Sequence, residues 1–237
     1  MCNIVAIILG RGGSKGIPSK NIIDFCGKPL LAWTILQASA VNYVTDVWVS
    51  SDSKKILDIA SKYGAKPILR PEAISGDRDT SESAWIHALN QIEVIVKRPA
   101  DYVLLPQVTS PLRRDDDFTL GIEKIIKNKA DSLLSVAEIE DHFIWEKDVF
   151  EKFISVNYDY QDRKLRQQIK TRYLENGSFY IVKPEILRKF NNRLGGKIAT
   201  HIMEQYKAFQ IDNIEDVRLC SVIMKGYNLD KIYKYVC

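Results

Sequence analysis

The sequence places four glycines and three cationic side chains in one short loop that directly follows an apolar run. The run covers residues 4–9, and the loop reads Gly10-Arg11-Gly12-Gly13-Ser14-Lys15-Gly16-Ile17-Pro18-Ser19-Lys20-Asn21. Glycine lets backbone N–H groups turn toward an anion, and Arg and Lys add positive charge and directional donors. The residue types therefore indicate a site for a polyphosphate, with Arg11, Lys15 and Lys20 as candidate ligands.

The spacing of this loop differs from the two best-known phosphate-binding motifs. The P-loop pattern G-x-x-x-x-G-K-[ST] is absent, and the dinucleotide pattern G-x-G-x-x-G would need glycine in place of Lys15. A flexible glycine-rich turn with solvated charges is the alternative interpretation, because short motifs often match by chance.

Polar residues also follow other predicted strands. Ser50-Ser51-Asp52 follow the strand predicted over residues 45–49, Arg70 follows 66–69, and the loop 106–113 follows 101–105. Asp212 ends the strand predicted over residues 207–211 and precedes the last helix. Its carboxylate suits either an N-cap or a magnesium ligand, and the two roles are compatible.

The order of the predicted elements brings these polar residues together. Strands over residues 4–9, 45–49, 66–69, 101–105 and 132–137 alternate with helices near 30–36, 54–63, 80–96 and 116–128. This alternation is typical of an α/β fold with a mostly parallel sheet and helices on both faces. Ligands of such sheets bind beyond the carboxyl ends of the strands. We therefore expect the loops after the strands to form one site.

The alternation breaks at residues 138–172, which read as an inserted segment. Short strands or a hairpin are predicted at 143–145 and 150–157, followed by a polar stretch to 172. A connection of this length is usually functional or an oligomer contact. Regular structure resumes with strands over 178–182, 198–203 and 207–211 and a final helix over 214–225. We expect residues 1–237 to form a single domain.

Composition excludes several classes of function. The chain has 237 residues and a net charge of +4, which is too mild and too dispersed to indicate nucleic-acid binding. No apolar run is long enough to span a membrane, and the N-terminus lacks a signal-peptide pattern. The four cysteines are scattered without metal-binding spacing, which favours free thiols in a cytoplasmic protein. We expect neither nucleic acid nor membrane as a partner.

Several segments together resemble the CMP-sialic acid synthetases, also called acylneuraminate cytidylyltransferases. The family's opening A-R-x-x-S-K-G-x-P-x-K-N matches residues 10–21 except at Gly10. Its V-S-T-D and L-R-P elements resemble residues 49–52 and 69–71, and its L-Q-P-T-S-P-L-R element resembles residues 106–113. Its R-Q and Y-x-E-N-G-S-x-Y elements resemble residues 166–167 and 173–180. The resemblance covers nearly the whole chain in the right order.

This resemblance implies a fold and a reaction. The fold would be a three-layer, Rossmann-like nucleotidyltransferase, in which the inserted segment 138–172 mediates a homodimer and completes the neighbour's site. The reaction would join CTP to a nine-carbon 2-keto-3-deoxy sugar acid (a nonulosonic acid), giving the CMP-sugar and pyrophosphate. Magnesium would be the cofactor, held in part by Asp212.

The resemblance also assigns roles to residues of this chain. Arg11, Ser14, Lys15 and Lys20 would hold the triphosphate, and Asn21, Arg70 and Ser81 would read the cytidine. Gln107, Thr109 and Ser110 would face the sugar acid. Arg166 would reach the reacting groups in its own or the neighbour's site, and Arg11, Lys20, Arg166 and Asp212 would be the catalytic residues.

Two departures from the family pattern leave alternatives open. Gln210 stands where the family often has the first Asp of D-x-D, so one carboxylate, Asp212, remains for magnesium. The turn 193–197, with Lys197 as a candidate substrate ligand, stands where some members carry aromatic residues against the sugar. The acceptor could therefore be sialic acid, its deaminated form KDN or a legionaminic-type acid. The alternatives are a cytidylyltransferase for the eight-carbon acid KDO and a nucleotide-binding module without turnover.

Overall fold

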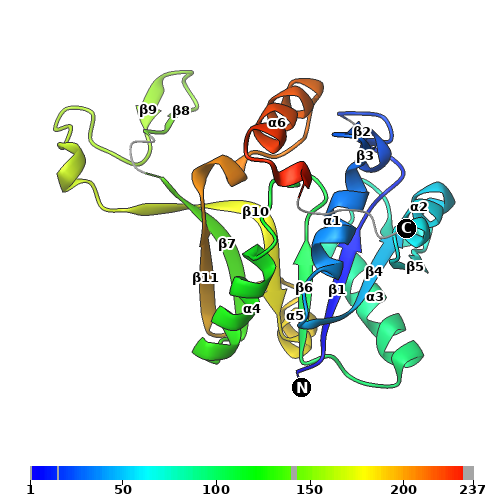
Figure 1. Cartoon of the computed structure of the whole chain (residues 1–237). Coiled ribbons are helices and arrows are strands. Elements are labelled where there is room, and N and C mark those ends of the chain that lie inside the picture. Colours follow the sequence, from blue (N-terminus) through cyan, green and yellow to red (C-terminus); the bar gives the residue numbers. More distant parts are fainter. Residues whose placement is uncertain (1, 15, 140–142, 232–237) are drawn as a thin grey trace.

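A twisted sheet of seven strands forms the centre of the molecule (Figure 1). The computed structural model describes residues 2–14, 16–139 and 143–231. The strands lie in the order β11-β7-β10-β6-β1-β4-β5. Their bounds are β1 Ile4–Leu9, β4 Val44–Ser51, β5 Lys66–Leu69, β6 Tyr102–Pro106, β7 Ser132–Ile139, β10 Arg172–Val182 and β11 Ile198–Met203.

The sheet is mostly parallel, as predicted. Strand β1 pairs in parallel with β4 and β6, β4 with β5, and β11 with β7. Only β10 among these described strands runs antiparallel to its neighbours, β6 and β7. The carboxyl ends of the other six strands therefore lie at one edge of the sheet.

Helices cover both faces of the sheet. Ile4, Ala6 and Ile8 of β1 pack in the same buried cluster as α1 (Leu30–Ser39), α2 (Lys54–Lys62), α4 (Asp117–Asn128) and α6 (Ile214–Gly226). Val5 and Ile7 face the opposite side, where α3 (Ser81–Val96) and α5 (Pro184–Phe190) lie. This alternation gives each central strand two buried faces. The predicted three-layer α/β fold is confirmed.

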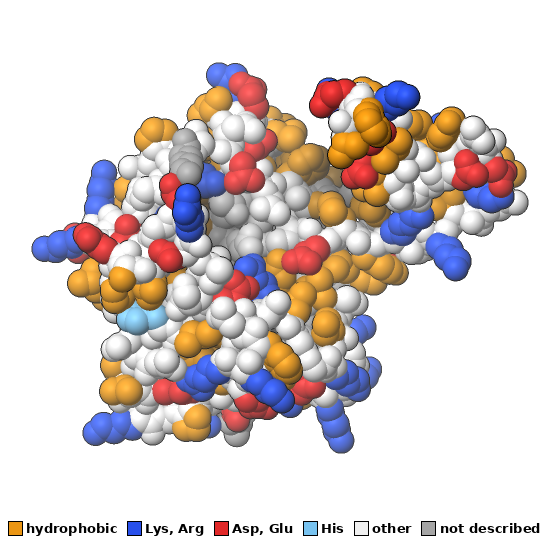
Figure 2. All heavy atoms as spheres, turned by 180° about the vertical axis from the view of Figure 1, so that it is seen from behind, with side chains coloured by type: hydrophobic (Ala, Val, Ile, Leu, Met, Phe, Trp, Pro, Cys, Tyr) orange, Lys and Arg blue, Asp and Glu red, His pale blue; other side chains and the backbone are white. Residues whose placement is uncertain are grey.

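The inserted segment forms an arm that projects from the body (Figure 1). Long extensions of β7 and β10 lead to a small antiparallel hairpin, β8 (Trp145–Lys147) and β9 (Phe153–Ser155), and then to a 3₁₀ turn, η3 (Arg166–Gln168). Figure 2 shows the arm set apart from the body, with hydrophobic side chains over much of its surface. The predicted hairpin is therefore present, and its role in a dimer stays a prediction.

The remaining described elements are short. The strands β2 (Asp24–Phe25) and β3 (Lys28–Pro29) form a turn before α1. The 3₁₀ turns are η1 (Lys20–Ile22), η2 (Glu72–Ile74), η4 (Gln205–Ala208) and η5 (Leu229–Lys231). None of the described helices has the length and apolar character needed to cross a membrane.

The strand predicted over residues 207–211 is wrong, because η4 occupies the start of this segment. The buried ammonium of Lys207 donates to the equally buried carboxylate of Asp117 at 2.8 Å and also pairs with Glu204 at 2.5 Å. Ile211 makes a single backbone hydrogen bond, to the carbonyl of Thr109, rather than a strand ladder. An ion pair distant in sequence therefore determines the path of this segment.

Replacing Asp117 by asparagine should destabilise the fold, because Lys207 would lose its main buried counter-charge. The expected loss is about 3 kcal/mol in the free energy of unfolding, measured with urea at neutral pH. Burial raises the pKa of Asp117, but His201 and Lys207 outweigh it, so this pKa lies below its usual value. The stabilisation is therefore full at neutral pH and lost as the pH falls below about 4. Equal stability of variant and wild type at neutral pH would contradict the role of the pair.

Candidate active site

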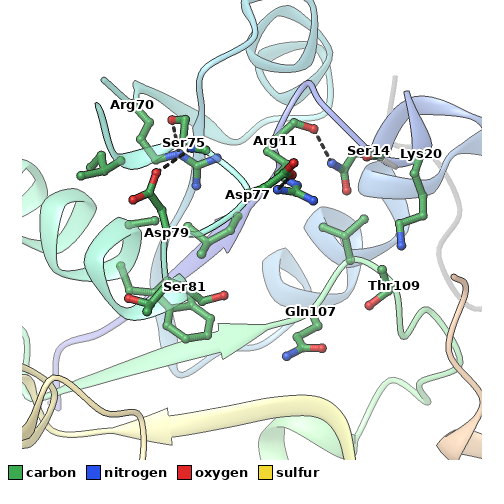
Figure 3. A pocket seen from close by; sticks show the side chains of 18 of the residues that line it. Arg11, Ser14, Lys20, Arg70, Ser75, Asp77, Asp79, Ser81, Gln107 and Thr109 are labelled. Atoms are coloured by element: carbon green, nitrogen blue, oxygen red, sulfur yellow. Dashed lines mark hydrogen bonds and ion pairs between the residues drawn. The ribbon is translucent and has the colours of Figure 1, made fainter. Parts of the chain in front are cut away.

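A cavity of about 650 Å³ lies at the carboxyl edge of the sheet (Figure 3). The loops after β1, β5 and β6, the start of α3 and the segment before α6 contribute its walls. Nine of the predicted site residues line it: Arg11, Ser14, Lys20, Asn21, Arg70, Ser81, Gln107, Thr109 and Asp212. The convergence expected from the order of the strands is therefore present.

The glycine-rich loop is held against the body by hydrogen bonds to its own backbone. The N–H of Gly12 donates to Oδ1 of Asp52 at 2.9 Å, and the side-chain amide of Asn21 donates to the carbonyl of Arg11 at 2.9 Å. Asn21 is buried, at the start of the short turn η1. These contacts leave the Arg11 side chain at the cavity wall (Figure 3).

Arg11 forms an ion pair across the cavity wall with Asp77, which lies between η2 and α3. Its Nη1 stands 2.8 Å from Oδ1 of Asp77. Both side chains are partly exposed, so water screens this pair. A phosphate oxygen offers the same hydrogen-bond geometry to a guanidinium as a carboxylate does. A bound polyphosphate can therefore replace Asp77 as the partner of Arg11.

Lys20 joins the opposite end of the loop to Asp212. Its Nζ donates to the carbonyl of Ile211 at 3.0 Å and to Oδ1 of Asp212 at 2.9 Å. At Gly16 the loop approaches so closely that a Cβ there would collide with the Asp212 carbonyl. The N-cap of α6 is Asn213, which forms a capping box with Asp216. The carboxylate of Asp212 is therefore not used as the cap and faces the cavity.

The residues around Asp212 fit a magnesium ion that arrives with a nucleotide. The part of the chain that the structure describes contains no group of three or more His, Cys, Asp or Glu side chains able to hold a metal. Gln210 donates its amide to the carbonyl of Asn176 at 3.0 Å, beside Gly177. Magnesium commonly uses one or two carboxylates and completes its shell with phosphates and water. One exposed carboxylate on this wall meets that requirement.

A buried arginine lies on the far side of the cavity. The side chain of Arg70 is only 5% exposed, and its Nε donates to the hydroxyl of Ser75 at 3.0 Å (Figure 3). Burial lowers the pKa of Arg70, and the nearby carboxylate of Asp52 opposes this shift. Ser81 begins α3, whose N-cap is Thr80. This wall offers a cation, hydroxyls and the buried ring of Trp85, which suit a base and sugar.

The third wall is the loop after β6, which Arg113 holds rigid. Its guanidinium is fully buried and donates to Oγ of Ser178, to Oε1 of Gln37 and to the carbonyl of Gln107. These bonds fix the segment that places Gln107 and Thr109 at the cavity. The wall presents an amide and a hydroxyl, groups that suit a polyhydroxylated ligand.

Comparison with known proteins now identifies the family. A family model described as cytidylyltransferase matches residues 5–113. The chain is 34% identical over 213 residues to N-acylneuraminate cytidylyltransferase A of Danio rerio, covering 89% of this chain and 48% of that protein. It is 30% identical over 225 residues to pseudaminic acid cytidylyltransferase of Campylobacter jejuni, covering 93% of this chain and 96% of that protein. The chain belongs to the cytidylyltransferase family.

The resemblance found in the sequence is therefore confirmed. The chain spans about half the length of the Danio rerio relative, at 48%, and nearly all of the Campylobacter jejuni relative, at 96%. A solved structure of CMP:2-keto-3-deoxy-manno-octonic acid synthetase with CTP matches with a TM-score of 0.70 and 16% identity. The match covers 95% of this chain and 99% of that one. It supports the shared fold and no more.

Two predicted substrate residues of this cytidylyltransferase family member do not line the cavity. Ser110 is fully buried, and its hydroxyl donates to the carbonyl of Gly177 at 3.5 Å. Lys197 precedes β11 and donates to the carbonyl of Asn128 at 2.6 Å. Because β11 runs parallel to β7, its first residue lies at the amino edge, away from the cavity. The structure therefore does not bring Ser110 and Lys197 to this cavity.

Two further predicted residues have no described side chain. Lys15 lies outside the described residues, and for Arg166 only the backbone position at the start of η3 is described. Their predicted roles stay predictions.

Several residues at the site were not predicted. Ser75, Asp77, Asp79 and Trp85 line the cavity. The Asp-Arg-Asp sequence of residues 77–79, between a predicted strand and a capped helix, was the available signal for the two aspartates. Arg193 stacks on Trp85 at 4.6 Å and pairs with Glu82 at 2.8 Å. Arg193 therefore holds the first turns of α3 through these two side chains.

Proposed function

We propose that the protein transfers the cytidylyl group of CTP to a nonulosonic acid, giving the CMP-sugar and pyrophosphate. The observation that carries the proposal is the cavity, where the glycine-rich loop, Arg70 with Ser81, and Gln107 with Thr109 form three walls. Family membership gives the nucleotide class, and the two relatives bear the names of different sugar acids. Sialic acid, KDN and legionaminic-type acids are the acceptors proposed here.

The walls suit an in-line displacement at the α-phosphorus. A hydroxyl of the sugar acid attacks, its proton passes to solvent, and the bond to pyrophosphate breaks. Arg11, Ser14 and Lys20 hold the phosphates and neutralise charge, while Arg70 and Ser81 fix the nucleoside. Gln107 and Thr109 orient the acceptor. Positioning and charge neutralisation supply most of the rate in such reactions.

Magnesium is the proposed cofactor. Asp212 would hold it, and the ion would neutralise phosphate charge when bound. Lys20 contacts the same carboxylate at 2.9 Å, so a magnesium ion would compete with the Lys20 ammonium for Asp212.

Phosphorus NMR tests the reaction directly. Incubation with CTP, magnesium and a suitable nonulosonic acid should replace the three CTP signals by one phosphodiester signal and one pyrophosphate signal. Formation of CDP with phosphate, or of free CMP as the first product, would contradict attack by the sugar acid at the α-phosphorus.

We also propose that the arm packs against a second copy of the chain and brings Arg166 near the neighbour's cavity, and that the enzyme acts in the cytoplasm. Support for the dimer comes from large apolar side chains exposed on the arm, among them Val149 at 90% and Phe150 at 78%. Exposed apolar patches of this kind commonly mark protein interfaces.

The double variant Val149→Asp with Phe150→Asp should weaken the dimer, because two charges would enter an apolar contact. Light scattering after gel filtration should show a dimer for the wild type and a monomer for the variant. Val94→Asp is the matched control, since Val94 is 74% exposed but lies on α3 in the body. A wild type that is monomeric at all concentrations would contradict the proposal.

A further inference from the structure

The segment 49–52, at the end of β4, holds both cationic walls of the cavity in place. On one side, the N–H of Gly10 donates to the carbonyl of Ser50 at 3.1 Å. On the other side, the N–H of Arg70 donates to the carbonyl of Ser51 at 2.8 Å. The end of β4 therefore fixes the position of the glycine-rich loop relative to the backbone of Arg70.

The side chain of Asp52, which follows β4, makes a second connection between the glycine-rich loop and Arg70. Its Oδ1 accepts the N–H of Gly12 at 2.9 Å and lies 3.8 Å from Nη2 of Arg70. Asp52 is largely buried, and Arg70 almost completely so. One carboxylate therefore faces the backbone of the glycine-rich loop and the charge of the buried arginine.

The backbone of Gly12 packs closely against the turn that contains Asp52 and Ser53, which leaves little room for the loop to move. A Cβ on Gly12 would lie 3.1 Å from Cβ of Ser53 and 3.5 Å from Oδ2 of Asp52. The loop thus rests directly on the turn that follows β4. A change in this turn would move the backbone that carries Arg11.

We propose that Asp52 is a positioning residue for the triphosphate of CTP. It holds the glycine-rich loop through Gly12 and compensates the charge of Arg70, although it does not itself line the cavity. This inference rests on the proposed function. Its consequence is selective: loss of Asp52 weakens the binding of CTP and leaves the affinity for the sugar acid unchanged.

Three variants test the role. Asp52→Ala removes the carboxylate, and Asp52→Asn keeps an oxygen that can accept the Gly12 N–H. The matched control is Asp46→Ala on β4, the strand that Asp52 directly follows. Asp46 has a side-chain exposure of 23% against 24% for Asp52, and it pairs with Lys66 away from the cavity. Calorimetry gives the Kd of CTP, steady-state kinetics give both KM values, and thermal unfolding checks the fold.

The expected result is a rise of about 10- to 100-fold in the Kd of CTP for Asp52→Ala, because a charge-assisted hydrogen bond is lost. The KM of the acceptor at saturating CTP should stay within about twofold of wild type, and Asp52→Asn should recover part of the affinity. Asp46→Ala should bind CTP like the wild type.

Two results would overturn the inference. One is CTP binding by Asp52→Ala as tight as by Asp46→Ala. The other is Asp52→Asn binding CTP no better than Asp52→Ala, which would remove the hydrogen bond to Gly12 as the route of action. A wild type that does not bind CTP would instead overturn the proposed function, so the two failures are distinguishable.

Discussion

Replacing Arg11 by alanine should lower kcat by about 10²- to 10³-fold, because one preorganised donor to the phosphates is lost. The fold should be retained. Arg11 lies in a loop at the cavity wall, and its partner Asp77 is partly exposed, so loss of the pair should change stability by less than about 1 kcal/mol. Pyrophosphate release and thermal unfolding of the purified variant measure the two effects.

Arg188→Ala is the matched control for this prediction. Arg188 has a side-chain exposure of 35% against 37% for Arg11, and it also forms one ion pair, with Glu93. It lies on α5, away from the cavity. If Arg11→Ala turned over CTP as fast as Arg188→Ala, this result would contradict the proposed phosphate-binding role of Arg11 in the glycine-rich loop.

Replacing Gly16 by alanine should lower kcat/KM by about 10²-fold, because displacement of a catalytic group by about 1 Å has a cost of this size. A Cβ at Gly16 would stand closer than 3.0 Å to the carbonyl oxygen of Asp212, a backbone atom that cannot rotate away. The loop must therefore shift away from Asp212 and take Lys20 with it. Steady-state kinetics with varied CTP and varied magnesium measure the loss.

Gly226→Ala provides the control, since Gly226 ends α6 and has open space where its Cβ would stand. It should keep full activity. A Gly16→Ala enzyme with normal magnesium dependence and normal kcat/KM would show that the close approach of the loop to Asp212 has no catalytic consequence.

The fold and most of the site could be predicted because they follow from local patterns. The apolar run before Gly10 and the alternation of strands with helices determine where each loop leaves the sheet. Once the strands are parallel, Arg70 and Gln107 must lie at the same edge as the glycine-rich loop. Nine predicted residues meet in the cavity for this reason.

The residues placed elsewhere depend on contacts distant in sequence. Ser110 is turned into the core by the bonds around Arg113 and Gly177. Lys197 lies at the other edge because β11 runs parallel to β7, a pairing that residue types alone do not reveal. The path of residues 207–211 depends on the buried pair of Lys207 with Asp117. Spacing along the chain carries none of this information.

In the proposed reaction, a nonulosonic acid triggers cleavage of CTP in this cavity. The direct measurement is the rate of pyrophosphate release from CTP and magnesium, taken with each member of a panel: sialic acid, KDN, a legionaminic-type acid, KDO and no acid. We expect rapid release with at least one nine-carbon acid and almost none with KDO or without acid. Tight binding of CTP without release for any acid would contradict it, and so would fastest release with KDO.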